Sequence, residues 1–148
     1  MAAPGRRTGF DGQLAAALLG GLVFWAGLWW WSRQVFDLSW PLREPLRFAL
    51  PAIVYPVLEE IIFRGGVQAF LLRFRQGQVR WRGVTGANAV TSVLFSAAHL
   101  FSHATPWAAG TLFPSLVFGY FRDRDGSLVL PIALHVFYNA GYFLLFAH

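Results

Sequence analysis

The sequence predicts an all-α fold, a multi-span bundle of transmembrane helices forming a single membrane domain over residues 1–148. Of these residues, 56% are hydrophobic and only 13% are charged, whereas soluble domains carry about 25% charged residues. Such a chain has too little polar surface to cover a core in water, but a bilayer accepts apolar side chains on the outside of a protein. Long uncharged stretches alternate with short arginine-containing loops. We therefore expect about five helices, with the active site in the interior of the bundle.

The first uncharged stretch, residues 13–31, is long enough to span a bilayer. Arg6 and Arg7 precede it, as in a secretory signal. However, the stretch ends in three consecutive tryptophans, and no small-residue cleavage site follows. A tryptophan cluster is typical of a helix anchored at the membrane interface. We interpret residues 13–31 as a retained N-terminal span, added to a catalytic core at residues 46–148.

Four further spans are expected in that core. They cover about residues 46–72, two short spans within the uncharged residues 83–121 that divide near residues 102–106, and about residues 128–147. The span at 46–72 is too long for a straight crossing. Its Pro51, its Pro56 and its Gly65-Gly66 pair predict kinks or a break.

The arginines predict the orientation of the chain. All 12 basic residues are arginines, scattered over short loops, a pattern that argues against a nucleic-acid partner. An N-terminus in the cytoplasm places eight on the inner side: Arg6, Arg7, Arg73, Arg75, Arg80, Arg82, Arg122 and Arg124. Three lie outside: Arg33, Arg43 and Arg47. The positive-inside rule favours this topology, and we expect a multi-pass protein of a bacterial inner (plasma) membrane.

Two adjacent carboxylates, Glu59 and Glu60, lie inside the second span. An ionisable side chain at the centre of a membrane helix costs about 2.5–3.5 kcal/mol, and neighbouring carboxylates raise each other's cost, so a functional role is the default interpretation. Arg64 follows Glu60 by four residues on the same helical face, which predicts an ion pair. Glu59, about 100° around the helix, would then face another partner. A second interpretation, compatible with this ion pair, is that Arg64 snorkels to the inner interface and Glu60 simply neutralises it.

Two other spans each carry a pair of motif side chains at a spacing of four, which stacks the pair on one helical face. These residues are Phe95 with His99 in the third span and His135 with Asn139 in the fifth. A lone histidine in an apolar helix is more often a hydrogen-bonded core residue. Together with the glutamates, however, the set supplies a base for water, an orienting imidazole and an amide donor for an oxyanion. No serine or threonine has comparable support as a nucleophile, so we expect an activated water.

A metal site is the first alternative. His103 follows His99 by four residues, a spacing that also suits metal ligands. The pair lacks the glutamate of an HExxH motif, and the chain contains no cysteine. We therefore expect no metal and no cofactor, and keep a metal-dependent membrane hydrolase as an alternative.

The polar residues form three motifs in chain order. Residues 59–64 read EEIIFR, residues 95–99 read FSAAH and residues 135–139 read HVFYN. Together they resemble the EExxxR, FxxxH and HxxxN motifs of the CPBP family, which is named for CAAX proteases and bacteriocin-processing enzymes. Each motif alone is weak, but the three in order on separate spans are specific. The resemblance covers about Leu46 to the C-terminus.

This resemblance implies an intramembrane glutamic endopeptidase that requires no metal. Its implied catalytic residues are Glu59, Glu60, His99, His135 and Asn139, with Arg64 and Phe95 in support. Glu59 would be the general base for water, and His99 would help to bind that water. Glu60 and Arg64 would support Glu59, while His135 and Asn139 would polarise the scissile carbonyl and stabilise the oxyanion.

The implied partners are the lipid bilayer and a membrane-associated peptide or protein substrate. The chain is short, with few helices around the core, and this favours a C-terminal sorting signal or similar peptide over a prenylated CAAX substrate. The motifs do not choose among these substrates, and the sequence is silent on the oligomeric state. A non-catalytic membrane partner, an immunity protein or a proton-conducting protein is the second alternative, because buried Glu and His chains also build proton relays.

Overall fold

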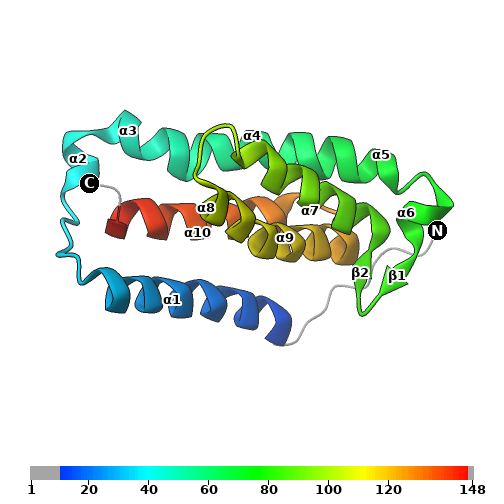
Figure 1. Ribbon diagram of the computed structural model, residues 1–148, viewed down its shortest axis with the longest axis horizontal. Helices are drawn as coiled ribbons and strands as arrows, with labels where there is room; N and C mark the ends of the chain where they lie inside the picture. Colours follow the sequence, from blue (N-terminus) through cyan, green and yellow to red (C-terminus); the bar gives the residue numbers. More distant parts are fainter. Residues whose placement is uncertain (1–10, 147–148) are drawn as a thin grey trace.

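The computed structural model of the protein describes residues 11–146, which are mostly helical (Figure 1). In chain order the helices are α1 (Gly12–Ser32), α2 (Trp40–Arg43), α3 (Pro45–Ala49), η1 (Leu50–Val54), α4 (Tyr55–Glu60), η2 (Ile61–Gln68), α5 (Ala69–Leu71), α6 (Arg75–Gln78), α7 (Gly86–His99), α8 (Thr105–Gly110), α9 (Leu112–Asp125) and α10 (Val129–Phe146). Two short strands, β1 (Arg80–Trp81) and β2 (Val84–Thr85), pair antiparallel. The predicted helical class is confirmed, while the number of membrane crossings stays a prediction. Arg6 and Arg7 lie outside the described residues.

The second predicted span is a run of consecutive helical segments from Pro45 to Leu71, in which the hydrogen-bond register changes at two places. The changes are π-helical turns, in which an N–H donates to the carbonyl five residues back. One turn, η1, contains Pro51, and the other, η2, contains the Gly65-Gly66 pair. The irregularities predicted at Pro51 and at the glycine pair are therefore present, as π-turns rather than as a break, whereas Pro56 lies in the first turn of the regular helix α4. The two turns enclose α4, which carries both glutamates.

The uncharged residues 83–121 form two helical arms, as predicted. The first arm is α7, which Thr85 caps by accepting a hydrogen bond from the backbone N–H of Asn88. The second arm consists of α8 and α9, which follow a connection through residues 100–104. α9 ends at Gly126, whose φ of +66° is a left-handed C-cap conformation that suits glycine. This cap turns the chain directly into α10.

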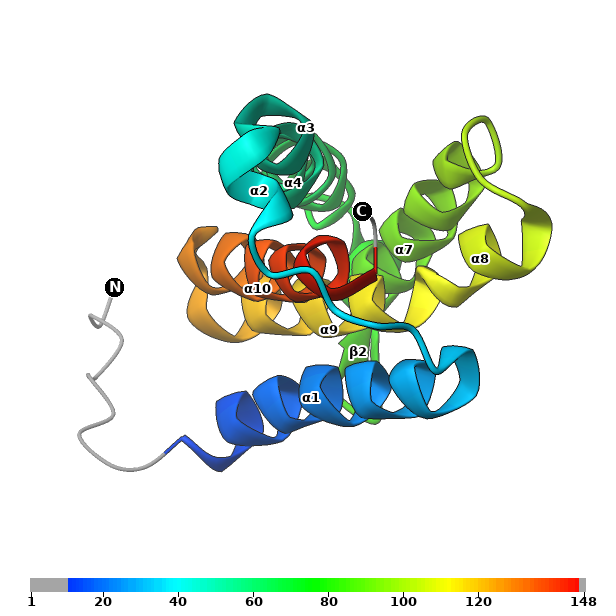
Figure 2. The same ribbon diagram turned by 90° about the vertical axis from the view of Figure 1, so that its left-hand side faces the viewer.

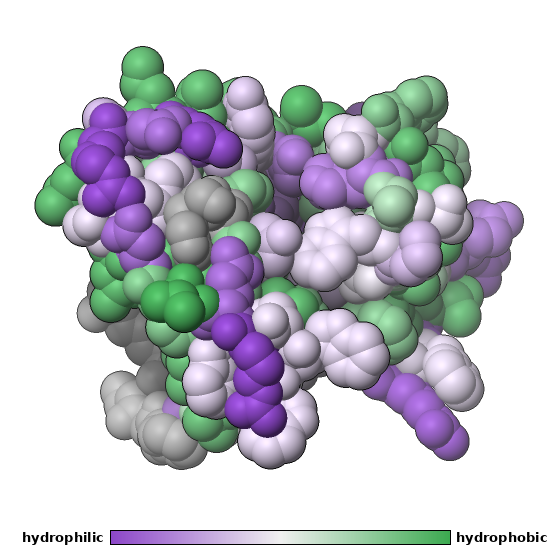
Figure 3. All heavy atoms as spheres, turned by 60° about the vertical axis from the view of Figure 1, so that its left-hand side comes forward, coloured by the Kyte–Doolittle hydropathy of each residue, from purple (hydrophilic) through white to green (hydrophobic). Residues whose placement is uncertain are grey.

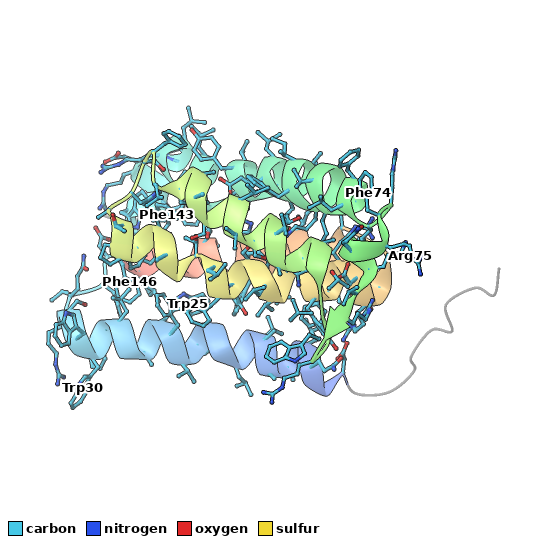
Figure 4. The ribbon with its side chains drawn as sticks, turned by 45° about the vertical axis from the view of Figure 1, so that its right-hand side comes forward. Trp25, Trp30, Phe74, Arg75, Phe143 and Phe146 are labelled. Atoms are coloured by element: carbon cyan, nitrogen blue, oxygen red, sulfur yellow. The ribbon has the colours of Figure 1, made fainter. Side chains whose placement is uncertain are left out.

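Side-chain bonds show which loops share an end of the bundle. At one end, Arg124 in the last turn of α9 pairs with Asp11 before α1 at 2.8 Å. At the other end, the indole N–H of Trp40 donates to the carbonyl of Leu144 at 3.3 Å. Figure 4 shows Arg75 and Trp30 at opposite ends. The basic loops that were expected to lie on one side of the membrane thus share one end, while the orientation of the chain stays a prediction.

Large apolar side chains cover the flanks of the bundle. On α1, for example, 70% of Val23 is exposed, and 58% of Val93 is exposed on α7. Figure 3 shows hydrophilic residues gathered over the end that carries α2 and hydrophobic residues around them. Contiguous apolar surface of this extent is unusual for a soluble monomer and is the expected surface in a bilayer. By length and composition, α1 and α10 can each cross a membrane.

α1 lies at the edge of the bundle, along α10 (Figure 2). Gly21 lets the two helices approach, because a Cβ at this position would be 2.9 Å from the ring of Tyr138. Trp25 packs its ring on Phe137 with a centroid distance of 4.8 Å. Most of the rest of α1 is exposed, which is consistent with a helix that faces lipid.

Candidate active site

Four packed elements bring the motif residues together. α4 and η2 supply the glutamates and the arginine, α7 supplies the phenylalanine and its histidine, and α10 supplies the second histidine. α9 packs against both α7 and α10. Glu60 and Arg64 are completely buried, and His135 is 4% exposed. Charged and polar groups therefore lie in the interior of the bundle.

Each carboxylate oxygen of Glu60 faces a different partner, one in an ion pair and the other in a hydrogen bond. Its Oε2 lies 3.3 Å from Nε of Arg64, and its Oε1 lies 2.8 Å from Nδ1 of His135. The ion pair predicted from the four-residue spacing is thus present. The alternative in which Arg64 snorkels to the interface is wrong, because its side chain has no exposed surface.

Arg64 also ties the long helix to α9. One of its terminal nitrogens donates to the backbone carbonyl of Ser115 at 2.8 Å and to the Ser115 hydroxyl at 2.7 Å. The guanidinium carbon lies 5.0 Å from the ring centroid of Phe95 and 5.7 Å from that of Phe118. Charge-assisted bonds and aromatic faces stabilise a buried arginine. The sequence reasoning missed Ser115, and its only signal was a polar residue in an uncharged stretch.

His135 lies between the two glutamates. An ionised Glu60 can only accept hydrogen bonds, so Nδ1 of His135 carries the proton of their contact. The other nitrogen, Nε2, faces Glu59 and lies 3.6 Å from its Oε2, a distance longer than a direct hydrogen bond. The ring stacks on Phe118 with a centroid distance of 4.7 Å. Glu60 and Phe118 together fix the orientation of the imidazole.

Glu59 lies at the open side of this cluster. Its side chain is 31% exposed, whereas that of Glu60 is completely buried. Two adjacent residues therefore differ in access to solvent, because one points between the helices and the other points toward their edge. A small molecule can reach the Glu59 carboxylate.

His99 lies one turn beyond Phe95 on α7. Its Nδ1 lies 2.9 Å from the carbonyl of Phe95, and this carbonyl can only accept, so Nδ1 is the protonated nitrogen of the neutral ring. Nε2 is then the nitrogen with the lone pair. Phe95, at 2% exposure, connects the histidines: its ring centroid lies 4.5 Å from that of His99 and 5.7 Å from that of His135.

Asn139 lies one turn beyond His135 on α10. Its Nδ2 donates to the backbone carbonyl of Pro51 at 3.0 Å. The asparagine therefore contacts the long helix through η1, at a residue eight positions before Glu59.

A family comparison gives this constellation a context. The family model of the Rce1-like type II CAAX prenyl endopeptidases matches residues 41–141. This chain belongs to the Rce1-like family. The predicted resemblance to the CPBP proteases is confirmed, and membership supports a membrane-embedded CAAX-type protease in general. No curated protein and no solved structure matches the chain significantly.

All three motifs of this Rce1-like protein lie inside the matched residues, and α1 lies before them. The family match does not assign catalytic roles to individual residues. In this protein such roles have to be argued from the arrangement of the side chains.

Polar contacts continue from Arg64 along the interior of the Rce1-like core. We call the whole set, including Glu60 and Arg64, the polar seam. Its members are Glu60, Arg64, Gln68, Thr85, Asn88, Ser115 and Asp123. Gln68 donates to the carbonyl of Gly119 at 3.0 Å and to Asp123 at 2.8 Å, and Thr85 donates to the same carboxylate at 2.7 Å. Sequence reasoning overlooked Gln68, although it continues the four-residue spacing of Glu60 and Arg64.

The alternative of a metal site requires a cluster of metal ligands. Within residues 11–146, no group of three or more His, Cys, Asp or Glu side chains is arranged to hold a metal ion. His103 is exposed, and its ring centroid lies 5.6 Å from that of His99. Its Nδ1 contacts the hydroxyl of Ser102 at 2.8 Å. His103 and Ser102 thus form a contact within the loop beside the site.

Proposed function

We propose that this Rce1-like protein is an intramembrane glutamic endopeptidase in which Glu59 activates water to hydrolyse a peptide bond of a membrane-associated substrate. The observation that carries the proposal is the unequal environment of the two glutamates. Glu60 is buried between Arg64 and His135, while Glu59 is accessible next to Nε2 of the same histidine.

Glu60 is unsuited to be the base. Both of its oxygens are engaged, and its side chain has no exposed surface. Taking up a proton there would weaken the ion pair with Arg64 and leave a buried cation. Glu59 has space for a water molecule and for a proton, so the general base is assigned to it. Glu60 then acts by orienting His135 and balancing the charge of Arg64.

The hydrolytic step follows from these positions. The Glu59 carboxylate takes a proton from water as the water oxygen bonds to the carbonyl carbon of the substrate. Nε2 of His99 accepts a hydrogen bond from this water and orients it. The carbonyl oxygen becomes an oxyanion, the C–N bond then breaks, and the proton held by Glu59 passes to the leaving amine.

Two donors on one face of α10 are assigned to the oxyanion. Asn139 supplies an amide N–H, and His135 supplies Nε2–H in its imidazolium form. Glu60 holds the ring in its orientation through the contact with Nδ1. Donors that are already oriented before the reaction stabilise the developing charge without reorganising.

The surroundings of Glu59 support a substrate held in the membrane. Leu58 and Ile62 flank it on the long helix, and 50% and 57% of these residues are exposed. An apolar edge next to the base suits a peptide that arrives from the lipid, such as one carrying a C-terminal CAAX-like or sorting signal. A test of the substrate should therefore compare peptides with and without a prenyl group.

The test is cleavage of a matched pair of peptides by the purified protein in detergent, one prenylated at a C-terminal CAAX cysteine and one without the prenyl group. A membrane-anchored protein with a C-terminal sorting signal is the third substrate. Glu59→Gln should reduce the rate by a factor on the order of 10²–10⁴. Glu44→Gln, the same change at an exposed glutamate paired with Arg47, should leave the rate unchanged.

Results other than these would each indicate a different function. Full activity of Glu59→Gln would contradict the proposed base. Cleavage that a chelator abolishes would indicate a metal hydrolase. Failure of the wild type to cleave any of the three substrates would direct the next measurement to proton conductance.

A further inference from the structure

The carbonyl of Pro51 is in an unusual position within the long helix. In an α-helix it would accept from the N–H of Tyr55, but in the π-turn η1 that N–H donates to Leu50 instead. In the π-register its donor would be residue 56, which is a proline and has no N–H. Neither helical register of residues 45–71 therefore supplies the Pro51 carbonyl with its backbone donor.

Asn139 supplies the missing donor from α10. Its Nδ2 lies 3.0 Å from the Pro51 oxygen. Because a carbonyl only accepts, this contact sets which way the carboxamide faces. One N–H of the amide is used, and the second remains for another acceptor. A carbonyl without a donor is strongly destabilising where no water can replace the donor, so the contact favours a single side-chain orientation.

We propose that Pro51 and Pro56 are positioning residues for Asn139: the π-turn and the missing N–H create a carbonyl that holds the Asn139 amide ready for the substrate oxygen. The catalytic part of this inference rests on the proposed function. The two donors then have separate supports, because Glu60 orients His135 while the backbone of the same helix orients Asn139. The irregular helix thus serves both donors of the oxyanion.

The first test is a stability cycle that needs no substrate. Asn139→Leu removes the donor, and Pro56→Ala restores a backbone N–H within reach of the Pro51 carbonyl. We expect Asn139→Leu to lower the midpoint of thermal unfolding in the parent chain, and to lower it much less in the Pro56→Ala background. The comparison between backgrounds cancels the buried ring atoms that Pro56→Ala also removes. Equal losses in both backgrounds would overturn the proposal.

The second test separates positioning from mere support of the fold. An N–H that competes for the Pro51 carbonyl should loosen Asn139, so Pro56→Ala should lower kcat by a factor on the order of 10 with KM unchanged. Pro45→Ala is the matched control, because Pro45 lies in the first turn of α3, where an N–H is not required by the helix. It should change neither constant.

The two tests fail in distinguishable ways. Coupling in the stability cycle with an unchanged kcat in Pro56→Ala would overturn the positioning role. Loss of the proposed function would instead appear as full activity of Glu59→Gln or as an inactive wild type, and the stability cycle would still decide whether Asn139 holds the Pro51 carbonyl.

Discussion

The core from α3 to α10 and the peripheral helix α1 are held by different kinds of contact. The core helices are joined by buried charged and polar side chains. Arg64 connects the long helix to α9 through the Ser115 hydroxyl and carbonyl, and Glu60 connects it to α10 through His135. Each of these bonds replaces water that a bilayer does not supply.

α1 instead meets α10 through small residues and aromatic rings. Gly141 leaves room for the ring of Trp25, which Figure 4 shows directed from α1 toward α10. Polar contacts accompany this packing: the hydroxyl of Tyr138 donates to the carbonyl of Ala17 at 2.8 Å, and Arg124 of α9 pairs with Asp11 and donates to the side-chain oxygen of Gln13 at 3.1 Å.

The difference follows from the solvent. Lipid tails are as apolar as leucine, so apolar contacts between membrane helices gain little, and close packing and polar bonds decide their association. The core should therefore be sensitive to single polar substitutions. A substitution that separates α1 from α10 should instead detach α1 and leave the core folded. That α1 is an addition to a catalytic core stays a prediction.

The largest effect is expected at Arg64. Arg64→Ala removes the cation beside Glu60 and the donor to Ser115, and leaves a buried carboxylate without its partner. Breaking a buried pair in this way costs about 3–5 kcal/mol. Thermal unfolding in detergent measures the loss.

A double variant sharpens this prediction. Adding Glu60→Gln to Arg64→Ala removes the stranded charge and should recover part of the lost stability. An Arg64→Ala protein as stable as the wild type would show that the polar seam does not hold the core together.

The next effect tests close packing in the core. A Cβ at Gly119 would overlap the side-chain amide of Asn88, whose Nδ2 donates to the carbonyl of Leu116. Gly119→Ala should therefore cost about 1–3 kcal/mol. Gly110→Ala is the control, since a Cβ there meets nothing within 4 Å. Equal stability of the two variants would contradict the close approach of α7 and α9.

A smaller effect on stability is expected where α1 meets α10. A Cβ at Gly141 would overlap the ring of Trp25, so Gly141→Ala should loosen α1 while the core keeps its unfolding midpoint. Leu18 packs against the core cluster from α1. Because the chain has no cysteine, Leu18→Cys provides a single reactive site. Maleimide should label it faster in the Gly141→Ala background, and an unchanged rate would show that α1 is docked by other contacts.

The smallest effect concerns Asp11. Its hydrogen bond from Arg124 lowers the pKa of the Asp11 carboxyl below its usual value. A lowered pKa in the folded state stabilises the protein above the unfolded pKa of about 3.9, and this contribution disappears as the pH falls through the folded value.

Asp11→Asn isolates this charge, because asparagine can still cap α1 at the N–H groups of Gln13 and Leu14. The variant should melt slightly below the wild type near pH 7, and the difference should shrink below about pH 4. A difference that persists at low pH would assign the effect to the cap rather than to the ion pair with Arg124.

Local patterns in the chain predicted much of this architecture. Charge-free stretches located the helical segments, and prolines and glycines located the irregular turns, because both depend on neighbouring residues only. The four-residue spacing from Glu60 to Arg64 predicted their ion pair for the same reason. The spacing did not reveal that the pair would be buried, since burial depends on α9 and α10 closing over that face of the helix.

By itself, therefore, the sequence determined the helical membrane class, the family and the identity of the motif residues. The tertiary structure alone decided which glutamate bonds His135, that Ser115 completes the environment of Arg64, and that Asn139 satisfies the carbonyl of Pro51. These contacts join residues 51 to 88 positions apart in the chain. The packing of the helices and the register shifts of the π-turns set their distances, and no local pattern contains that information.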